Sequence, residues 1–243
     1  MSGNSKGQNP LSDAQVAEFA ARGYAIVPGV LSAAECAAVI AAAQELEGPK
    51  TGSFKPVMQP HRQHDVFLAT LAHPRLANIV AQLVGGEPAA LQSEMFFCKP
   101  GTRGFTAHQD NFFVRGERGK FVSAWIPLVD VTPRMGSLFM FPGSQELGLL
   151  PIRETHLPAT ADQDVDGYSR EAVFPAGYEA QAEDLSAPAG AAVLLDGDLV
   201  HGSNPNMSDK FRYVLLCTYI RAGSSFNPGR HAKRSEIPLR PRA

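Results

Sequence analysis

Four side chains that could build a metal site stand in a fixed order along the 243 residues. His108 and Asp110 are two residues apart, His201 follows about 90 residues later, and Arg212 stands eleven residues beyond His201. If residues 105–112 form a strand, His108 and Asp110 point to the same face, because alternate side chains of a strand share a face. An imidazole and a carboxylate held in this way could bind one metal ion, with His201 as the third ligand.

Two histidines and one carboxylate form the ligand set of non-haem Fe(II) oxygenases, which leaves three positions open for cosubstrate and O2. Arg212 adds a planar guanidinium suited to a carboxylate. Each feature alone has an ordinary explanation: His-x-Asp spacing occurs by chance, a lone histidine is usually a core residue, and a lone arginine usually makes a surface salt bridge. Their order in one chain favours the metal site. His61 and His64 are also close, but no third ligand lies near them.

The chain from about residue 92 to residue 220 resembles the phytanoyl-CoA dioxygenase family of Fe(II)/2-oxoglutarate-dependent oxygenases. The resemblance rests on an ordered set of motifs: His108-Gln109-Asp110, Ala124-Trp125, Gly136-Ser137-Leu138, Phe141-Pro142-Gly143-Ser144, and His201-Gly202-Ser203 with Arg212. As a set they are specific for the family. They are not specific for a substrate, because members hydroxylate lipids, amino acids, osmolytes and natural-product intermediates.

The resemblance implies that His108, Asp110 and His201 ligate iron, and that Arg212 and Ser203 hold the distal carboxylate of 2-oxoglutarate. Trp125 and Gln92 match positions that line the cosubstrate pocket, although Trp125 could be only a core residue and Gln92 only a satisfied strand residue. The cofactor and cosubstrates would be Fe(II), 2-oxoglutarate and O2, with succinate and CO2 as products. A carboxylate at position 110 implies hydroxylation, since some relatives with Gly or Ala there bind chloride instead.

Composition limits the other possibilities. The formal net charge of −2 argues against general nucleic-acid binding, and no apolar run approaches the 18 residues of a membrane span. The first residues lack the apolar core of a signal peptide, so we expect 1–10 to be a disordered tail. Three cysteines in apolar contexts are typical of free core thiols and of a reducing cytoplasm. The expected partner is a small molecule, and the protein would be a monomer or a homodimer.

The elements that must position the site follow from local patterns. Capping boxes at Ser12–Gln15 and Ser32–Glu35 predict two helices around a strand at 24–28, and an apolar stripe predicts a third helix at 74–83. After residue 89, apolar runs with Gly and Pro punctuation predict a mainly β fold, a double-stranded β-helix (jelly roll, cupin-like). The predicted strands are 90–99, 105–112, 121–128, 137–141, 191–195 and 212–220.

We therefore expect one domain over residues 11–243. It would consist of an N-terminal helical support region (11–88), a jelly-roll core (89–222) and a C-terminal tail that wraps the surface (223–243). Residues 149–187 break the strand rhythm and predict an insertion over the barrel mouth. Residues 48–65 are irregular and basic, which fits either a solvated loop or a flap that touches an anionic substrate.

The substrate is less well defined. Basic residues in loops could border the mouth, which suggests a small polar, anionic molecule, or could merely keep the loops solvated: Lys55, Arg62, Arg103, Arg115, Arg118 and Lys120. Phe112 and Phe113 could pack its apolar part, and Gln109 could orient the site or contact substrate. Alternatives are an oxygenase for a lipid, acyl-CoA or natural-product intermediate, a non-catalytic metal-binding sensor, and a Zn hydrolase, since three N/O ligands also suit Zn.

Overall fold

A computed structural model describes residues 11–46, 56–156 and 168–239. Within them, strands from both ends of the chain join one antiparallel sheet of seven strands. Its order is β1 (Tyr24–Val27), β9 (Ala192–Asp196), β4 (Phe121–Pro127), β11 (Arg212–Arg221), β3 (Pro88–Cys98) and β12 (Ile237–Pro238), with β2 (Val57–Met58) also on β3. The single domain expected for residues 11–243 stays a prediction, although β1 and β12 share this sheet.

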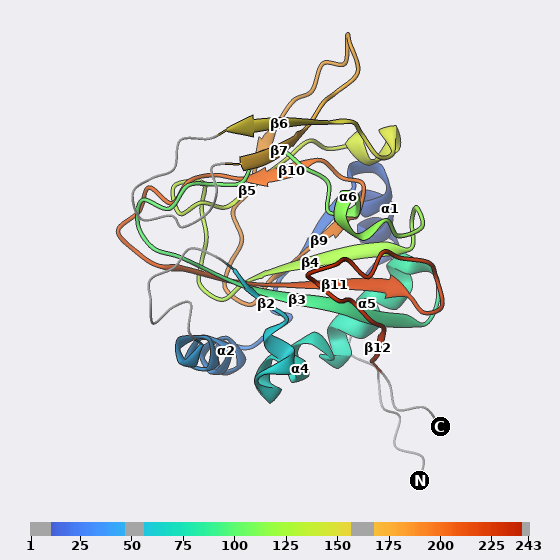
Figure 1. The fold of residues 1–243 in the computed structure, drawn as a ribbon. Coiled ribbons are helices and arrows are strands. Elements are labelled where there is room, and N and C mark those ends of the chain that lie inside the picture. Colours follow the sequence, from blue (N-terminus) through green and yellow to red (C-terminus); the bar gives the residue numbers. More distant parts are fainter. Residues whose placement is uncertain (1–10, 47–55, 157–167, 240–243) are drawn as a thin grey trace.

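A smaller antiparallel sheet faces the large one (Figure 1). It consists of β10 (His201–Ser203), β5 (Leu138–Met140) and β8 (Glu183–Asp184). The two layers form the double-stranded β-helix that the strand punctuation predicted. The predicted insertion contributes a hairpin of β6 (Ile152–His156) and β7 (Tyr168–Ala172), and Ala172 bonds back to Ala107 beside the site.

Strand alternation separates a helix-facing side of the large sheet from a cavity-facing side. On β11, Leu215, Cys217 and Tyr219 belong to the largest hydrophobic cluster, and Tyr213 packs against it. The intervening residues Val214 and Leu216 pack in a second cluster on the opposite face. One face of the sheet thus packs on the helices, while the other face carries a second hydrophobic cluster and lines the cavity.

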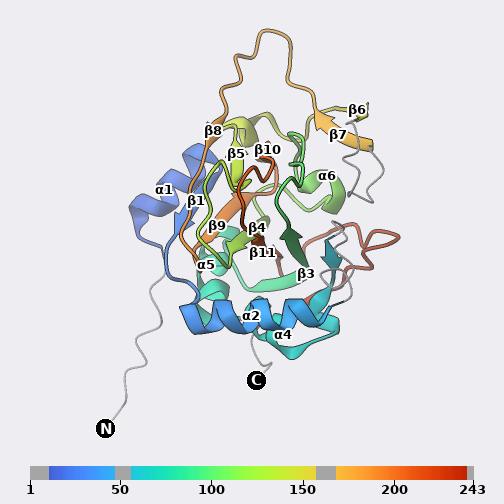
Figure 2. The same cartoon turned by 90° about the vertical axis from the view of Figure 1, so that its left-hand side faces the viewer.

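Helices cover that core face. They are α1 (Asp13–Arg22), α2 (Ala33–Glu45), α4 (Asp65–Leu71) and α5 (Pro74–Val84), and α2, α4 and α5 lie beneath the large sheet in Figures 1 and 2. Both predicted capping boxes are present, at Ser12 and at Ser32. The helix α4 was not predicted. It begins where the His64 side chain accepts a bond from Val66 N, and it buries Phe67 and Leu71.

The prediction of a strand over residues 105–112 is wrong. His108 makes only an isolated bridge, to His201, and Asp110 has helical backbone angles (φ −60°, ψ −35°) that lead into α6 (Asn111–Val114). The cause is long-range: Asn111 N donates to Gly197 O, and its side chain bonds Gly116 and Asp198. His108 and Asp110 therefore come together through a turn rather than through strand alternation.

The C-terminal segment does more than wrap the surface, because β12 pairs with β3 and Arg234 reaches the main cavity. Two short 3-10 helices, η1 (Pro60–Arg62) and η2 (Ser144–Leu147), complete the regular elements of the described residues. Cys36, Cys98 and Cys217 are buried free thiols, as predicted. In the described ranges no helix has both the length and the apolarity to cross a bilayer.

Candidate active site

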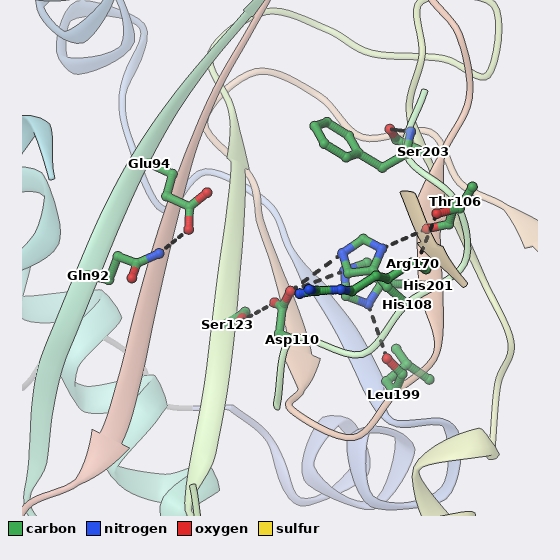
Figure 3. A network of polar contacts seen from close by, with 11 residues as sticks. Gln92, Glu94, Thr106, His108, Asp110, Ser123, Arg170, Leu199, His201 and Ser203 are labelled. Atoms are coloured by element: carbon green, nitrogen blue, oxygen red, sulfur yellow. Dashed lines mark hydrogen bonds and ion pairs between the residues drawn. The ribbon is translucent and has the colours of Figure 1, made fainter. Parts of the chain in front are cut away.

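The structure brings together the three predicted metal ligands. Asp110 Oδ1 lies 3.7 Å from His108 Nε2 and 3.8 Å from His201 Nε2. The candidate ligand atoms of the three residues all lie within 4.8 Å of one another. Figure 3 shows the two imidazoles and the carboxylate converging between the two sheets. Two nitrogen donors and one oxygen donor around a common point form the ligand set of a mononuclear iron site.

Backbone carbonyls orient both imidazoles. His108 Nδ1 lies 2.7 Å from Thr106 O, and His201 Nδ1 lies 3.1 Å from Leu199 O. A carbonyl can only accept, so each Nδ1 carries the proton and each Nε2 keeps its lone pair for a metal. Burial, and then the neighbouring His201, lower the pKa of His108 to about 4, while Asp110 opposes the shift. The imidazole of His108 is therefore neutral at pH 7, the form that binds a metal.

Two residues around the triad fix its geometry. Ser123 Oγ on β4 donates to Asp110 Oδ2 at 2.5 Å, which leaves Oδ1 for the metal. Gln109 is 2% exposed and does not face the cavity, and its amide bonds Asp198 O, Gly148 O and Leu150 N. Of the two roles considered for Gln109, the structure supports orientation. Ser123 carries no local sequence signal, because the bond to Asp110 links two separate segments.

The triad opens onto a cavity of about 490 Å³. Gln92, Trp125, Ser203 and Arg212 all line it, so the predicted cosubstrate residues and the triad face one space. Trp125 is nevertheless 6% exposed and packs in the second hydrophobic cluster, so it is a core residue as well as a wall of the cavity. The rest of the lining is rich in aromatic and aliphatic side chains, including Phe96, Phe105, Phe113, Phe121, Leu138 and Leu216.

Arg212 is held rigidly at the start of β11. Its guanidinium donates to Gly136 O and lies 2.9 Å from Cys98 Sγ, and the residue is 3% exposed. Its Nε is buried and has no hydrogen-bond partner in the described structure. A buried donor left unpaired is costly, and a carboxylate is the natural acceptor for a guanidinium. Arg212 therefore fits the distal carboxylate of 2-oxoglutarate, and the triad's N and O donors fit Fe(II).

Ser203 supports the site mainly through the backbone. Its Oγ accepts a hydrogen bond from Phe105 N at 3.0 Å, and its carbonyl packs so closely on Gly104 that a Cβ at residue 104 would overlap it. These contacts tie the segment carrying His108 to the strand β10 that carries His201. Ser203 also lines the cavity that Arg212 lines.

The basic loop residues named above are not part of the described cavity wall. The five of these residues that the structure describes, Arg62, Arg103, Arg115, Arg118 and Lys120, do not line the cavity, and Lys55 lies outside the described ranges. Local partners hold several of them: Arg118 pairs with Glu146, and Arg62 donates to Lys233 O. The cations that do line the cavity are Arg212, Arg170 on β7 and Arg234 near the C-terminus. Phe113 lines it as expected, whereas Phe112 does not.

The segment 48–65 is only partly described. Pro56 and Met58 line the cavity, whereas Lys50 lies outside the described residues. His61 is not a loop residue exposed to solvent, because it is 7% exposed and its Nδ1 lies 2.6 Å from Ser93 Oγ. Burial, with Arg62 in second place, lowers the pKa of His61 to about 4.

A double-stranded β-helix with a His-x-Asp and a distant His around one point, and an arginine facing the same cavity, defines the class of iron-dependent oxygenases that use 2-oxoglutarate. The sequence model of the phytanoyl-CoA dioxygenase (PhyH) family matches residues 19–214. The chain belongs to that family, and it is an enzyme of the Fe(II)/2-oxoglutarate-dependent dioxygenase class.

Individual relatives agree with this assignment. The ectoine dioxygenase of Stutzerimonas stutzeri is 27% identical, over 86% of this chain and 77% of its own length. The ectoine dioxygenase of Halomonas elongata is 29% identical, over 87% of this chain and 70% of its own. A phytanoyl-CoA dioxygenase of Arabidopsis thaliana is 30% identical, over 80% of this chain and 67% of its own.

Solved structures confirm the fold. The epimerase SnoN from nogalamycin biosynthesis, in complex with Fe3+, alpha ketoglutarate and nogalamycin RO, superposes with a TM-score of 0.72 at 21% identity, over 94% of this chain and 95% of its own. EctD from S. alaskensis, with 2-oxoglutarate and 5-hydroxyectoine, gives a TM-score of 0.68 at 22% identity, over 93% of this chain and 81% of its own.

Proposed function

We propose that this enzyme hydroxylates a small, polar or anionic molecule while 2-oxoglutarate and O2 are converted to succinate and CO2. His108, Asp110 and His201 hold Fe(II), and Arg212 with Ser203 holds the distal carboxylate of 2-oxoglutarate. Trp125 walls the same pocket. The observation that carries the proposal is that the three ligand atoms, within 4.8 Å of one another, share one cavity with the buried guanidinium of Arg212.

The residues of the chain position the cosubstrate and balance its charge, while a bound iron would supply the redox chemistry of O2. Two imidazoles and one carboxylate as ligands would leave a bound Fe(II) with a net positive charge, which favours an anionic cosubstrate. Arg212 balances the far end of that cosubstrate, and the apolar walls keep bulk water from the reacting atoms.

Two features of the cavity and the identity of several relatives support a small polar substrate. The cavity volume of about 490 Å³ must hold cosubstrate and substrate together, which leaves little room for a long acyl chain. Arg170 and Arg234 add positive charge beyond Arg212. Several of the relatives are ectoine dioxygenases, and ectoine is a small polar molecule of this kind.

A non-catalytic sensor or a Zn hydrolase explains the site less well. Neither needs a buried arginine whose Nε lacks a partner in the described residues at one end of the cavity. A hydrolase also needs a general base beside the metal, and among the described lining residues the carboxylate other than Asp110 is Glu94, which lies on β3, away from the triad.

The decisive experiment is an anaerobic titration of the apoprotein with Fe(II) and 2-oxoglutarate, monitored by the metal-to-ligand absorption band. The wild type should develop the band, and His108→Ala should abolish it. Succinate formation under O2 should depend on both additions. A wild type that binds Fe(II) but never develops the band would refute the proposal and favour a sensor.

A further inference from the structure

The wall of the cavity carried by β3 and the C-terminal segment holds a cluster that the metal site does not use. Gln92 and Glu94 project from the same face of β3, and Gln92 Nε2 donates to Glu94 Oε1 (Figure 3). Arg234 comes from the segment between β11 and β12 and lines the same cavity. Its Nη1 lies 3.3 Å from the carbonyl oxygens of Phe113 and Asn227, which anchor it.

The acceptors of this cluster need donors that the described residues do not provide. Gln92 Oε1 is buried and has no hydrogen-bond partner among the described residues. Glu94 uses one oxygen for Gln92, and Figure 3 shows the other directed towards the side of the cavity where the triad lies. An unpaired buried acceptor and a carboxylate in an apolar cavity are both costly unless a ligand supplies N–H groups or a positive charge.

Arg234 provides the opposite chemistry in the same cavity. Its Nε is also buried without a partner in the described structure, and no ion pair there joins it to Glu94. Burial and then Asp110 raise the pKa of Glu94 to about 7, while Arg234 and the Gln92 amide oppose the rise. Burial lowers the pKa of Arg234, and Glu94 opposes it. The two groups therefore feel each other's charge across the cavity without closing on each other.

The sheet register places this cluster at a useful distance from the metal site. Gln92 pairs with Thr218 on β11, and Thr218 pairs with Ser123 on β4, the residue that bonds Asp110. Neighbouring strands are about 5 Å apart, so Gln92 lies about 10 Å across the sheet from Ser123. A molecule the size of an amino acid can span that gap and present a carbon atom to the iron.

We propose that Gln92, Glu94 and Arg234 form a substrate subsite that selects a small zwitterion. The amine or other N–H group of the substrate binds Glu94 and Gln92 Oε1, and its carboxylate binds Arg234. This inference rests on the proposed hydroxylase function and names its substrate class. It also assigns Gln92 to substrate binding instead of the cosubstrate pocket expected from the sequence.

The test measures binding to the loaded enzyme under anaerobic conditions. The Fe(II)/2-oxoglutarate complex is first confirmed by its absorption band, and the midpoint of thermal unfolding is then recorded with α-amino acids, ω-amino acids and ectoine. Each is compared with its matched amine, acid and neutral amide. Zwitterions should raise the midpoint more than compounds with one charge, and those that bind should stimulate succinate formation under O2.

Two variants with matched controls assign the charges. Glu94→Gln should weaken zwitterion binding by about 10- to 100-fold and leave the 2-oxoglutarate titration within about twofold. Arg234→Ala should remove the preference of the enzyme for the zwitterion over the matched amine. The controls Glu87→Gln, before β3, and Arg230→Ala, on the C-terminal segment, change exposed residues of the same charge and should have neither effect.

The outcomes separate this inference from the function on which it rests. If the band fails to form in the wild type, the hydroxylase proposal fails. If the band forms but zwitterions bind no better than acids or amides, or none of them binds, the subsite is refuted alone. The same holds if Glu94→Gln binds zwitterions as the wild type does.

Discussion

Ser123 Oγ donates a 2.5 Å hydrogen bond to Oδ2 of Asp110, while Oδ1 of the same carboxylate faces both histidines. The serine lies on the central strand β4 and is fully buried, so it fixes which oxygen is offered to the metal. Groups that orient a metal ligand in this way typically contribute 10- to 100-fold to metal affinity or activity.

Ser123→Ala should therefore weaken Fe(II) binding by about 10- to 100-fold while the fold is retained, because the carboxylate is free to rotate. Anaerobic Fe(II) titration measures the effect. Ser93→Ala is the control: this serine is equally buried, on β3, but it bonds His61 rather than a ligand. Equal losses of metal affinity in both variants would contradict the positioning role of Ser123.

Arg212→Lys should weaken 2-oxoglutarate binding by about 10- to 100-fold, about 1.4 to 2.7 kcal/mol, since an ammonium cannot reproduce the guanidinium fork. Fe(II) affinity should change little, because Arg212 is not one of the clustered ligands. Titrating the absorption band with 2-oxoglutarate separates the two affinities. Arg221→Lys, at the exposed end of the same strand, should behave as the wild type. Unchanged 2-oxoglutarate affinity in Arg212→Lys would assign the cosubstrate to another cation.

Gln109→Ala should lower the free energy of unfolding by about 3 kcal/mol, because three hydrogen bonds in the interior lose their partner. Urea unfolding of the apoprotein measures the loss. The exposed Gln63→Ala should stay near the wild-type value. A Gln109 variant as stable as the wild type, with only its substrate preference altered, would show that Gln109 contacts substrate instead.

His61 should make the apoprotein sensitive to acid. The pKa of His61 is about 4 in the folded protein, below its ordinary value near 6.5, so the unfolded chain binds more protons between these values. Stability is then lost as the pH falls from about 6.5 towards 4. His61→Gln should flatten this slope in thermal unfolding, although it lowers stability at pH 7 by removing the bond to Ser93. The exposed His231→Gln should keep the wild-type slope, and an unchanged slope in His61→Gln would assign the acid sensitivity to other groups.

The sequence alone determined whatever depends on residue type and short spacing. Both capping boxes join residues three apart, and the alternation of Tyr213, Leu215, Cys217 and Tyr219 follows from the two-residue period of a strand, so both features can be recognised from neighbouring residues alone. The identity and order of His108, Asp110, His201 and Arg212 likewise fixed the donor set of the site.

Tertiary structure decided what depends on distant pairing. Residues 105–112 turn into a helix because Asn111 bonds Gly197 and Asp198, which no local pattern contains. Ser123 meets Asp110, and Arg234 reaches the cavity of Glu94, only after β4, β11, β3 and β12 have set their register. Local propensity acts over a few residues, whereas packing and long-range hydrogen bonds choose the neighbours of a buried polar group, so only the folded chain could identify these residues.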